Sequence, residues 1–233
     1  MSHTLSSNPS EVLSKDGSSR VTDEFYNTWL AALGAVLSLI GVVVIISMAA
    51  IEHKPWHVLS FAIYGITLMS VFITSALHHG VDGSKETNQL LHQLDYLAIS
   101  LMIAGTFTPF CLIALRNTLG CSVLGLAWFL ALLGIVLKLK FPDLPKRIST
   151  GLFIVMGWLG LAIAYPLYQK TPWGLGVMMV GGLFFTIGAA IFTLEKPNPV
   201  PGRFGFHEIW HLFVLAGAGS HFFAIYLYLL PIQ

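Results

Sequence analysis

Phe206-His207-Glu208-Ile209-Trp210-His211 opens an apolar stretch that continues to Leu230. A helix needs about 20 apolar residues to span the hydrocarbon core of a bilayer, and residues 209–230 meet that length without Asp, Glu, Lys or Arg. On a helix, His207 and His211 lie about one turn apart on the same face, which is the spacing at which two imidazoles can bind one metal ion. Ionisable groups are costly to bury in a membrane segment, so this pair predicts a functional site.

The composition of the whole chain indicates an integral membrane protein. Of its 233 residues, 55% are hydrophobic and only 10% are charged, which leaves too little polar surface for a soluble domain of this size. A net charge of +1 without a basic run argues against nucleic-acid binding. Seven windows are long and apolar enough to predict an all-α membrane protein, a seven-transmembrane-helix bundle. These windows are residues 29–51, 58–77, 96–115, 119–137, 148–168, 172–194 and 209–230.

The distribution of positive charge predicts the orientation of this bundle. Short cytoplasmic loops of membrane proteins carry an excess of Lys and Arg. Nine of the twelve Lys and Arg residues fall in the N-terminal segment or after the second, fourth and sixth windows. We therefore expect a polar cytoplasmic segment at residues 1–27 and a transmembrane domain at residues 28–233, with the N-terminus cytoplasmic and the C-terminus outside. With no large soluble extension, we expect a multi-pass protein of a cell inner membrane.

Two further patterns concern how the helices are connected and packed. The connection from Lys196 to Gly202 contains three prolines at alternate positions, so we expect an extended, stiff loop that fixes where His207 enters the membrane. Small residues let helix backbones approach closely in lipid. We expect this packing role for Gly151, Gly157, Gly160, Gly181, Gly182, Gly188 and residues 216–220.

Polar residues gather at the predicted cytoplasmic ends of three helices, the second, third and last. Catalytic zinc prefers histidine nitrogen and takes three protein ligands plus a water, so three histidines and one carboxylate in this layer indicate a zinc site. Ser75 and His79 have i,i+4 spacing, but so do Thr74 and His78, and periodicity alone leaves both histidines open as ligands. The residues of the layer are Ser75, His78, His79, His92, Asp95, His207 and His211.

Three blocks of this sequence resemble the signature blocks of the haemolysin III family. That family is grouped with the progestin and adipoQ receptors and is more distantly similar to alkaline ceramidases. The likeness covers nearly all of the chain from about Glu24 onward. The blocks are Ser75-Ala76-Leu77-His78-His79, Leu94-Asp95-Tyr96 running into residues 103–110, and Pro199 to His211.

The resemblance implies a seven-helix fold with a zinc ion held by three histidines near the cytoplasmic face. It maps the metal ligands onto His79, His207 and His211, and so favours His79 over His78. It maps the remaining polar positions of the family onto Asp95 and Ser75. In the receptor branch the Asp contacts zinc through a water, and a lipid amide hydrolase activity is attributed to that branch.

One departure from the family lies in the first helix. Many members begin this region with Glu-x-x-Asn-Ser and then carry a Thr-His-Gly sequence, whereas this chain has Glu24-Phe25-Tyr26-Asn27-Thr28 followed by residues 29–33 without a histidine. An accessory role of that histidine therefore does not transfer to this protein, although the three proposed ligands are untouched.

The polar layer and the resemblance together lead to the hypothesis of a zinc-dependent hydrolase at the cytoplasmic side of the bilayer, and the resemblance implies that its substrate is a lipid acyl amide or ester. Zn²⁺ would lower the pKa of its bound water, Asp95 would orient that water and accept its proton, and Ser75 would steady the water or the oxyanion. Membrane lipids or a fatty acid are the expected partners. The alternative is a non-enzymatic receptor-like or membrane-homeostasis protein with a structural zinc. A pore-forming haemolysin is less favoured, because seven retained hydrophobic helices offer no soluble form.

Simpler roles are expected for the other ionisable residues near these helices. We expect His92 to be exposed at the interface, with a position facing the same cavity as Asp95 as the alternative. We expect His78 to be a loop or supporting residue and Glu208 to be a solvated or supporting carboxylate, and for His221 a contact with a lipid pocket is an alternative role. His221 lies roughly 15 Å deeper than His211 at the helical rise per residue, so we expect a buried, hydrogen-bonded histidine that cannot share the same ion. For Asp95, capping of the third helix is an alternative, because a carboxylate favours the positive end of the helix dipole.

Overall fold

The structure is a computed structural model that describes residues 24–142 and 144–233. Within these residues it contains seven spans that are long and apolar enough to cross a membrane, which confirms the predicted seven-helix bundle. Residues 1–23 of the expected N-terminal segment lie outside the described residues, and the first helix already begins at Glu24. The α-helices are α1 (Glu24–Ile51), α2 (Pro55–Gly80), α3 (Lys85–Pro109), α4 (Thr118–Lys140), α5 (Lys146–Trp158), α6 (Ala164–Lys170), α7 (Pro172–Leu194) and α8 (Phe206–Ala224).

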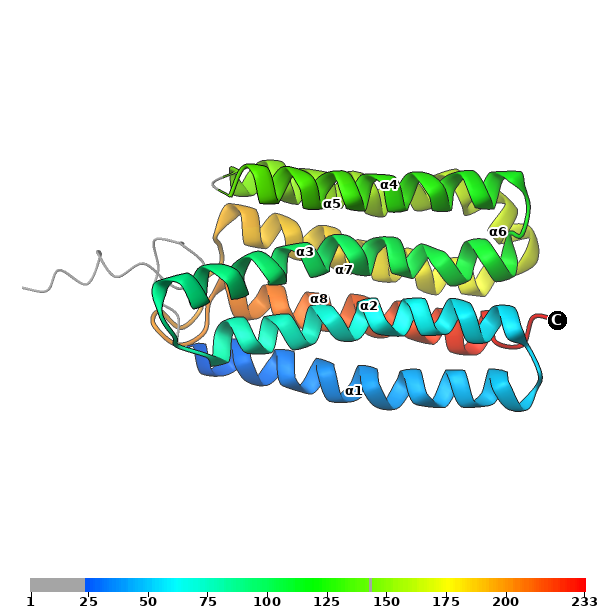
Figure 1. Ribbon diagram of the computed structural model, residues 1–233, viewed down its shortest axis with the longest axis horizontal. Coiled ribbons are helices and arrows are strands. Elements are labelled where there is room, and N and C mark those ends of the chain that lie inside the picture. The colour runs from blue at the N-terminus through cyan, green and yellow to red at the C-terminus, as the bar shows by residue number, and fades with distance from the viewer. Residues whose placement is uncertain (1–23, 143) are drawn as a thin grey trace, which may run out of the picture.

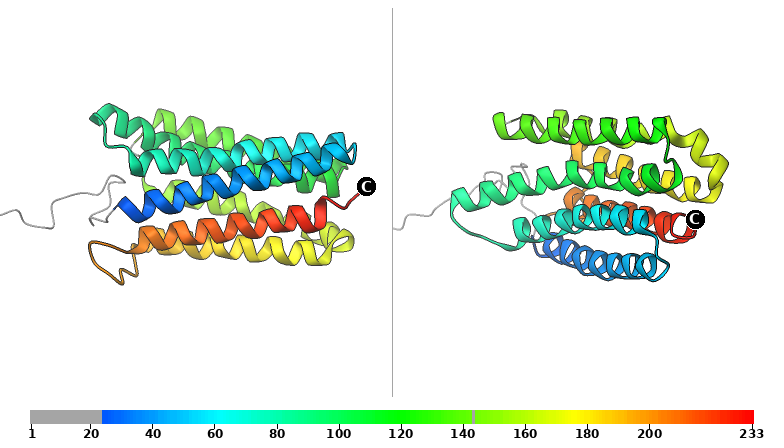
Figure 2. Two further views of the ribbon diagram at one scale, coloured as in Figure 1. Left: turned by 90° about the horizontal axis from the view of Figure 1, so that it is seen from below. Right: turned by 45° about the vertical axis from the view of Figure 1, so that its right-hand side comes forward.

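Successive spans run in opposite directions, so the bundle has two distinct ends (Figure 1). One end holds the start of α1, the end of α2, the start of α3 and the start of α8, whereas the C-terminus lies at the other end. Figure 2 shows α8 between α1 and α7, and α8 contacts both of them. The polar layer is thus confined to one end of the bundle, and its assignment to the cytoplasm stays a prediction from the positive-inside rule.

Three of the spans depart from regular α-helix. The third ends in a π-helical turn, Phe110–Ala114, and the seventh ends in another, Ile225–Leu229. The first π turn follows Pro109, whose missing N–H removes a regular helical hydrogen bond. The fifth span consists of α5 and α6 joined by a 3₁₀ turn, Leu159–Ile163, just before Pro166, where the proline ring excludes a regular preceding α turn.

The connection between α7 and α8 is non-helical, as predicted, but it is not extended. Val200 and Phe204 form an isolated antiparallel bridge, and Gly202 adopts a φ of 80°, a left-handed conformation that favours glycine. The Asn198 side chain accepts a hydrogen bond of 3.2 Å from the backbone N–H of Phe206, one of the N–H groups left unpaired at a helix start. A tight turn, and not a stiff extended segment, therefore sets where α8 begins.

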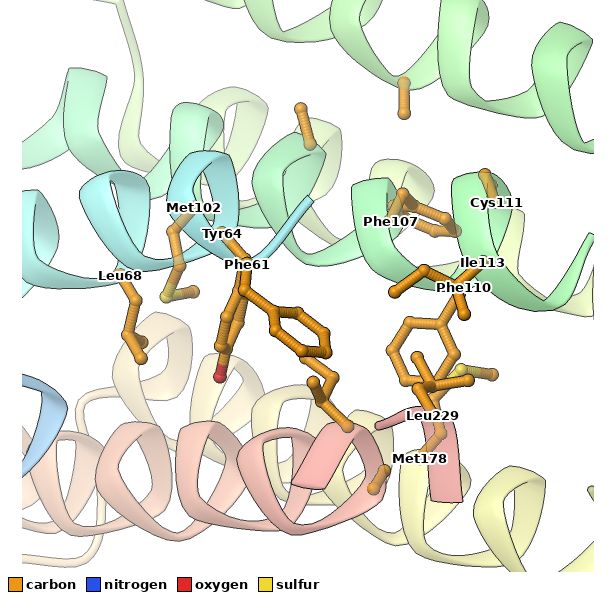
Figure 3. Packing of buried hydrophobic residues seen from close by; sticks show 14 of the residues in the cluster. Phe61, Tyr64, Leu68, Met102, Phe107, Phe110, Cys111, Ile113, Met178 and Leu229 are labelled. Carbon is orange, nitrogen blue, oxygen red and sulfur yellow. The ribbon is translucent and has the colours of Figure 1, made fainter. Parts of the chain in front are cut away.

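The interior of the bundle is filled by apolar side chains from several helices (Figure 3). Phe61 and Tyr64 of α2 are almost completely buried, and Met102 of α3 belongs to the same cluster. Toward the end that holds the C-terminus, the two π turns contribute Phe110 and Leu229. Since lipid is itself apolar, this packing holds the bundle through close van der Waals contact.

The predicted packing role of glycine is confirmed between α7 and α8. A methyl group added at Gly188 would lie 2.7 Å from Cβ of Phe213 and 2.9 Å from the ring of Trp210. A methyl group at Gly217 would lie 2.9 Å from the ring of Phe185. The same prediction is wrong for four other glycines, where an added Cβ would meet no other described residue within 4 Å. These glycines are Gly151, Gly157, Gly182 and Gly219.

Replacing Gly188 by alanine should therefore destabilise the protein. Cβ of Phe213 is fixed to its backbone and cannot move aside, and overpacking of this kind costs about 1–3 kcal/mol. Thermal unfolding of purified protein in detergent should show a lower Tm for Gly188→Ala. The matched control Gly151→Ala places the same methyl group in open space and should keep or raise the Tm. Equal Tm values for the two variants would contradict the packing described here.

Candidate metal site

Three imidazoles converge where the end of α2 meets the start of α8. One ring nitrogen from each of His79, His207 and His211 lies within 4.8 Å of the other two, and all three side chains are buried. Nε2 of His79 and Nε2 of His211 are 3.1 Å apart. Nitrogen ligands of a tetrahedral zinc ion lie about 3.3 Å from one another, given zinc–nitrogen bonds of about 2.0–2.1 Å. The donor set and its spacing therefore fit a single divalent metal ion.

The relative orientation of the rings follows from their places on the two helices. His207 and His211 lie one turn apart on α8, and their rings stack with centroids 5.0 Å apart. His79 lies in the last turn of α2 and stands edge-on to both rings at 4.9 Å. The structure thus brings together the three residues that the sequence predicted as ligands and selects His79, not His78, for the group.

Glu24, which the sequence interpretation did not single out, holds the His79 ring. Its Oε2 lies 2.6 Å from Nδ1 of His79, and Nδ2 of Asn27 donates a hydrogen bond of 3.2 Å to the same oxygen. With Nδ1 engaged by a carboxylate, Nε2 of His79 is directed at the other two histidines. Such carboxylate–histidine pairs fix the orientation and basicity of metal-binding imidazoles. The available signal was the acidic residue at the start of the first helix, within the Glu24-Phe25-Tyr26-Asn27 sequence.

Glu208 lies between the two histidines of α8 in sequence but has a different role. Its side chain is completely buried, which rules out the solvated carboxylate and leaves the supporting one of the two expected roles. Oε2 of Glu208 accepts a hydrogen bond of 2.7 Å from the backbone N–H of Gly205, as in a helix capping box. This carboxylate therefore stabilises the first turn of α8 and with it the positions of His207 and His211.

Asp95 and Ser75 lie on facing helices beside the histidine group. The Ser75 hydroxyl is within hydrogen-bonding reach of the Asp95 carboxylate, and both residues line a cavity together with His207. The capping alternative for Asp95 is wrong, because α3 begins at Lys85 and Ser84 provides its N-cap. A carboxylate and a hydroxyl thus face the same space as the candidate metal ligands.

The cavity extends from the histidine group into the apolar interior between α2, α3, α5, α7 and α8. Its empty volume is about 1650 Å³ when the part open to the surroundings is included. At its deeper part lies His221, whose Nε2 is 3.0 Å from the carbonyl oxygen of Met178. The expected hydrogen bond is confirmed, but the residue is only partly buried and it lines the cavity, as the alternative role required. His211 and His221 are separated by roughly 15 Å at the rise of an α-helix. The walls of the cavity are mainly apolar, which suits a hydrocarbon group.

Two histidines that we expected at the surface or in a loop also line this cavity. His78 belongs to α2 and is only 3% exposed, and His92 is partly buried on α3. Their ring centroids are 5.2 Å apart. The expectation of an exposed His92 is wrong because α3 extends well beyond its apolar window, back to Lys85, so that the first turns of α3 pack beside α2.

The fold and the site define a seven-helix membrane protein with a buried group of three histidines that could hold a metal ion. The sequence matches the family described as "Haemolysin-III related" over residues 19–222, and the chain belongs to that family.

Several known proteins are similar to this chain over most of its length. It is 37% identical to "Hemolysin-3" of Bacillus cereus over 91% of this chain and 94% of that protein. It is 26% identical to "Monocyte to macrophage differentiation factor" of Homo sapiens over 75% of this chain and 72% of that protein. It is 29% identical to "Adiponectin receptor protein" of Drosophila melanogaster over 88% of this chain and 50% of that protein. The family thus joins bacterial proteins with receptor-named proteins of animals.

The contact between Glu24 and His79 predicts a measurable effect on metal affinity. Glu24→Ala should lower the affinity for Zn²⁺ by about 10- to 100-fold, because the His79 ring loses the partner that orients it. Glu24→Gln retains an acceptor oxygen and should have a smaller effect. Competition with a chromophoric chelator measures both affinities, and Glu86→Ala, which removes a fully exposed carboxylate at the start of α3, serves as the control. Unchanged affinity in Glu24→Ala would show that this carboxylate does not support the site.

Proposed function

We propose that this protein is a zinc-dependent hydrolase that cleaves an acyl amide or ester bond of a lipid at the cytoplasmic side of a cell inner membrane. The proposal rests above all on one observation: two of the three clustered histidines line a long apolar cavity whose wall also carries Asp95 and Ser75. A metal site with three protein ligands leaves a coordination position free, which is typical of catalytic zinc and not of structural zinc.

Zinc is the metal we propose because the donor set consists of three imidazole nitrogens with no thiolate near them. A zinc ion in such a site supplies Lewis acidity, which lowers the pKa of water toward about 7 and polarises a carbonyl group. The remaining requirements for hydrolysis are a group that moves protons and a site that orients the lipid. Side chains of this protein can meet both.

Asp95 is the proposed general base and acid. Its carboxylate accepts a proton from the attacking water as the new carbon–oxygen bond forms, and returns that proton to the leaving nitrogen or oxygen as the acyl bond breaks. The Ser75 hydroxyl, which lies within hydrogen-bonding reach of this carboxylate, would orient it. Glu24 and Glu208 act indirectly, through the metal ligands. Glu24 orients His79, and Glu208 stabilises the helix turn that carries His207.

The apolar part of the cavity is the proposed site of the acyl chain. Its walls lie between helices that are surrounded by lipid, so a substrate can reach it from the bilayer. The expected partners are therefore membrane lipids and the fatty acid released from them. Binding energy from the long chain would hold the acyl bond at the polar end, where positioning contributes to the rate.

A non-enzymatic receptor-like role is the second candidate. The observation that favours it is that Glu24, His79 and the histidines of α8 tie three helices together at one end of the bundle. For this role the metal would be structural, and a fourth protein ligand would complete its coordination. Direct coordination of the ion by Asp95 would support the structural role, and dependence of turnover on Asp95 supports the catalytic one.

Two substitutions separate these possibilities. His211→Ala should abolish stoichiometric zinc, and Asp95→Asn should keep the zinc and lower turnover by about 10²- to 10⁴-fold. Zinc is measured by elemental analysis of purified protein, and turnover by release of fatty acid from a fluorescent acyl amide in proteoliposomes. Asp82→Asn, which changes an exposed aspartate between α2 and α3, should retain both zinc and turnover. A fully active Asp95→Asn protein would refute the proposed base, and zinc retained by His211→Ala would refute the site.

A further inference from the structure

His78 is a buried residue that lines the cavity, and its ring nitrogens have no hydrogen-bond partner among the residues that the structure describes. It is 3% exposed. A buried imidazole without hydrogen bonds is destabilising, so a membrane protein that retains one requires a physical reason. Because His78 lines the cavity, the space in front of it can hold a molecule that supplies the missing hydrogen bonds.

The surroundings of His78 form a small polar corner beside the candidate metal site. Its ring centroid is 4.7 Å from that of His79 and 5.2 Å from that of His92. His92 in turn packs edge-on against Tyr96 at 5.0 Å, and Asp95 lies between them in the sequence of α3. The corner is thus built by residues of α2 and α3, whereas the candidate metal ligands His207 and His211 belong to α8.

We propose that His78 and His92 bind a hydroxyl group on the part of the lipid that leaves when the acyl bond is cleaved. This inference rests on the proposed hydrolase function and assigns the residues that bind the leaving portion of the lipid. With the acyl bond at the histidine group and the acyl chain in the deeper cavity, the leaving portion extends from the polar end. The ring of His78 lies beside that of His79, so it is close to where the leaving portion would begin.

The chemistry of the corner selects a hydroxyl over other polar groups. A neutral imidazole offers one donor and one acceptor nitrogen, and a hydroxyl group offers both functions in return. An anionic group such as a phosphate would lie close to the Asp95 carboxylate, which disfavours it. A site built to hydrogen-bond a substrate hydroxyl discriminates strongly against an analogue that lacks it, because its own buried polar groups are then left without partners.

Two amides of the same size test the inference without requiring turnover. N-(2-hydroxyethyl)palmitamide and N-propylpalmitamide differ only by a hydroxyl in place of a methyl group. Their binding is measured by ligand-dependent thermal shift and by competition with a fluorescent fatty acid, on zinc-loaded Asp95→Asn protein in detergent. The hydroxylated amide should bind about tenfold more tightly, as one or two net hydrogen bonds to buried partners predict. His78→Phe should reduce this ratio to about one, and His92→Phe should reduce it as well.

His57→Phe is the matched control, since it makes the same substitution in another buried histidine of α2. His57 lies at the opposite end of the helix, where its Nε2 contacts the carbonyl oxygen of Leu229, and it does not line the cavity. This variant should keep the tenfold preference. Zinc content and Tm confirm that each variant is folded, and if His78→Phe does not fold, His92→Phe carries the comparison.

Several outcomes would overturn the inference. They are equal affinity for the two amides in the protein with both histidines, binding of neither amide, and an unchanged preference in folded His78→Phe and His92→Phe proteins. Failure of the hydrolase proposal is distinguishable, because it would appear as absent fatty-acid release by the unsubstituted protein while the preference for the hydroxylated amide persists. Hydrolysis of both amides with no preference in binding would support the hydrolase and reject the hydroxyl subsite.

Discussion

The architecture of this protein depends on the convergence of imidazoles from α2 and α8 at one end of a bundle that is otherwise apolar. The Nε2 atoms of His79 and His211 approach to 3.1 Å, and Glu24 from α1 engages the opposite side of the His79 ring. Polar groups inside a membrane protein must find partners within the protein or at a bound ion. The requirement to satisfy these histidines therefore positions the ends of three helices that are far apart in sequence.

The remaining features of this end of the bundle support the same convergence. The turn at Gly202 and the cap from Glu208 set where α8 begins, and Gly188 of α7 lets the two helices approach. On the other side of the histidines, the bundle leaves a long cavity in place of a filled core. A polar group of this kind at the end of an apolar cavity is suited to a molecule with both a reactive head and a hydrocarbon chain.

Membership in the Haemolysin-III related family places this chain beside proteins whose names point in different directions, from a bacterial hemolysin to an animal receptor. A fold hosts many functions, and the argument for any one of them has to come from the site. Here the site combines three imidazoles that could hold a metal ion with a carboxylate and a hydroxyl on the wall of a mainly apolar cavity. His78 and His92 add two further imidazoles to that wall.

The sequence alone determined the class of fold and most of the candidate ligands. Apolar windows of membrane length predict seven spans because the bilayer sets a minimum length, and the i,i+4 spacing of His207 and His211 is a property of a single helix. The resemblance to a known family then favoured His79 over His78 and selected Asp95 and Ser75 from the polar layer. These features depend on local spacing or on recognisable motifs, and for that reason they can be read before the helices are assembled.

Only the tertiary structure decided which side chains from different helices meet. The contact of Glu24 with His79 spans 55 residues, and no periodicity within one helix predicts it. The same holds for His78 and His92, which the sequence placed in a loop or at the surface and which face the cavity because α3 begins earlier than its apolar window. The lateral position and rotation of each helix follow from packing against its neighbours, and a linear pattern does not contain that information.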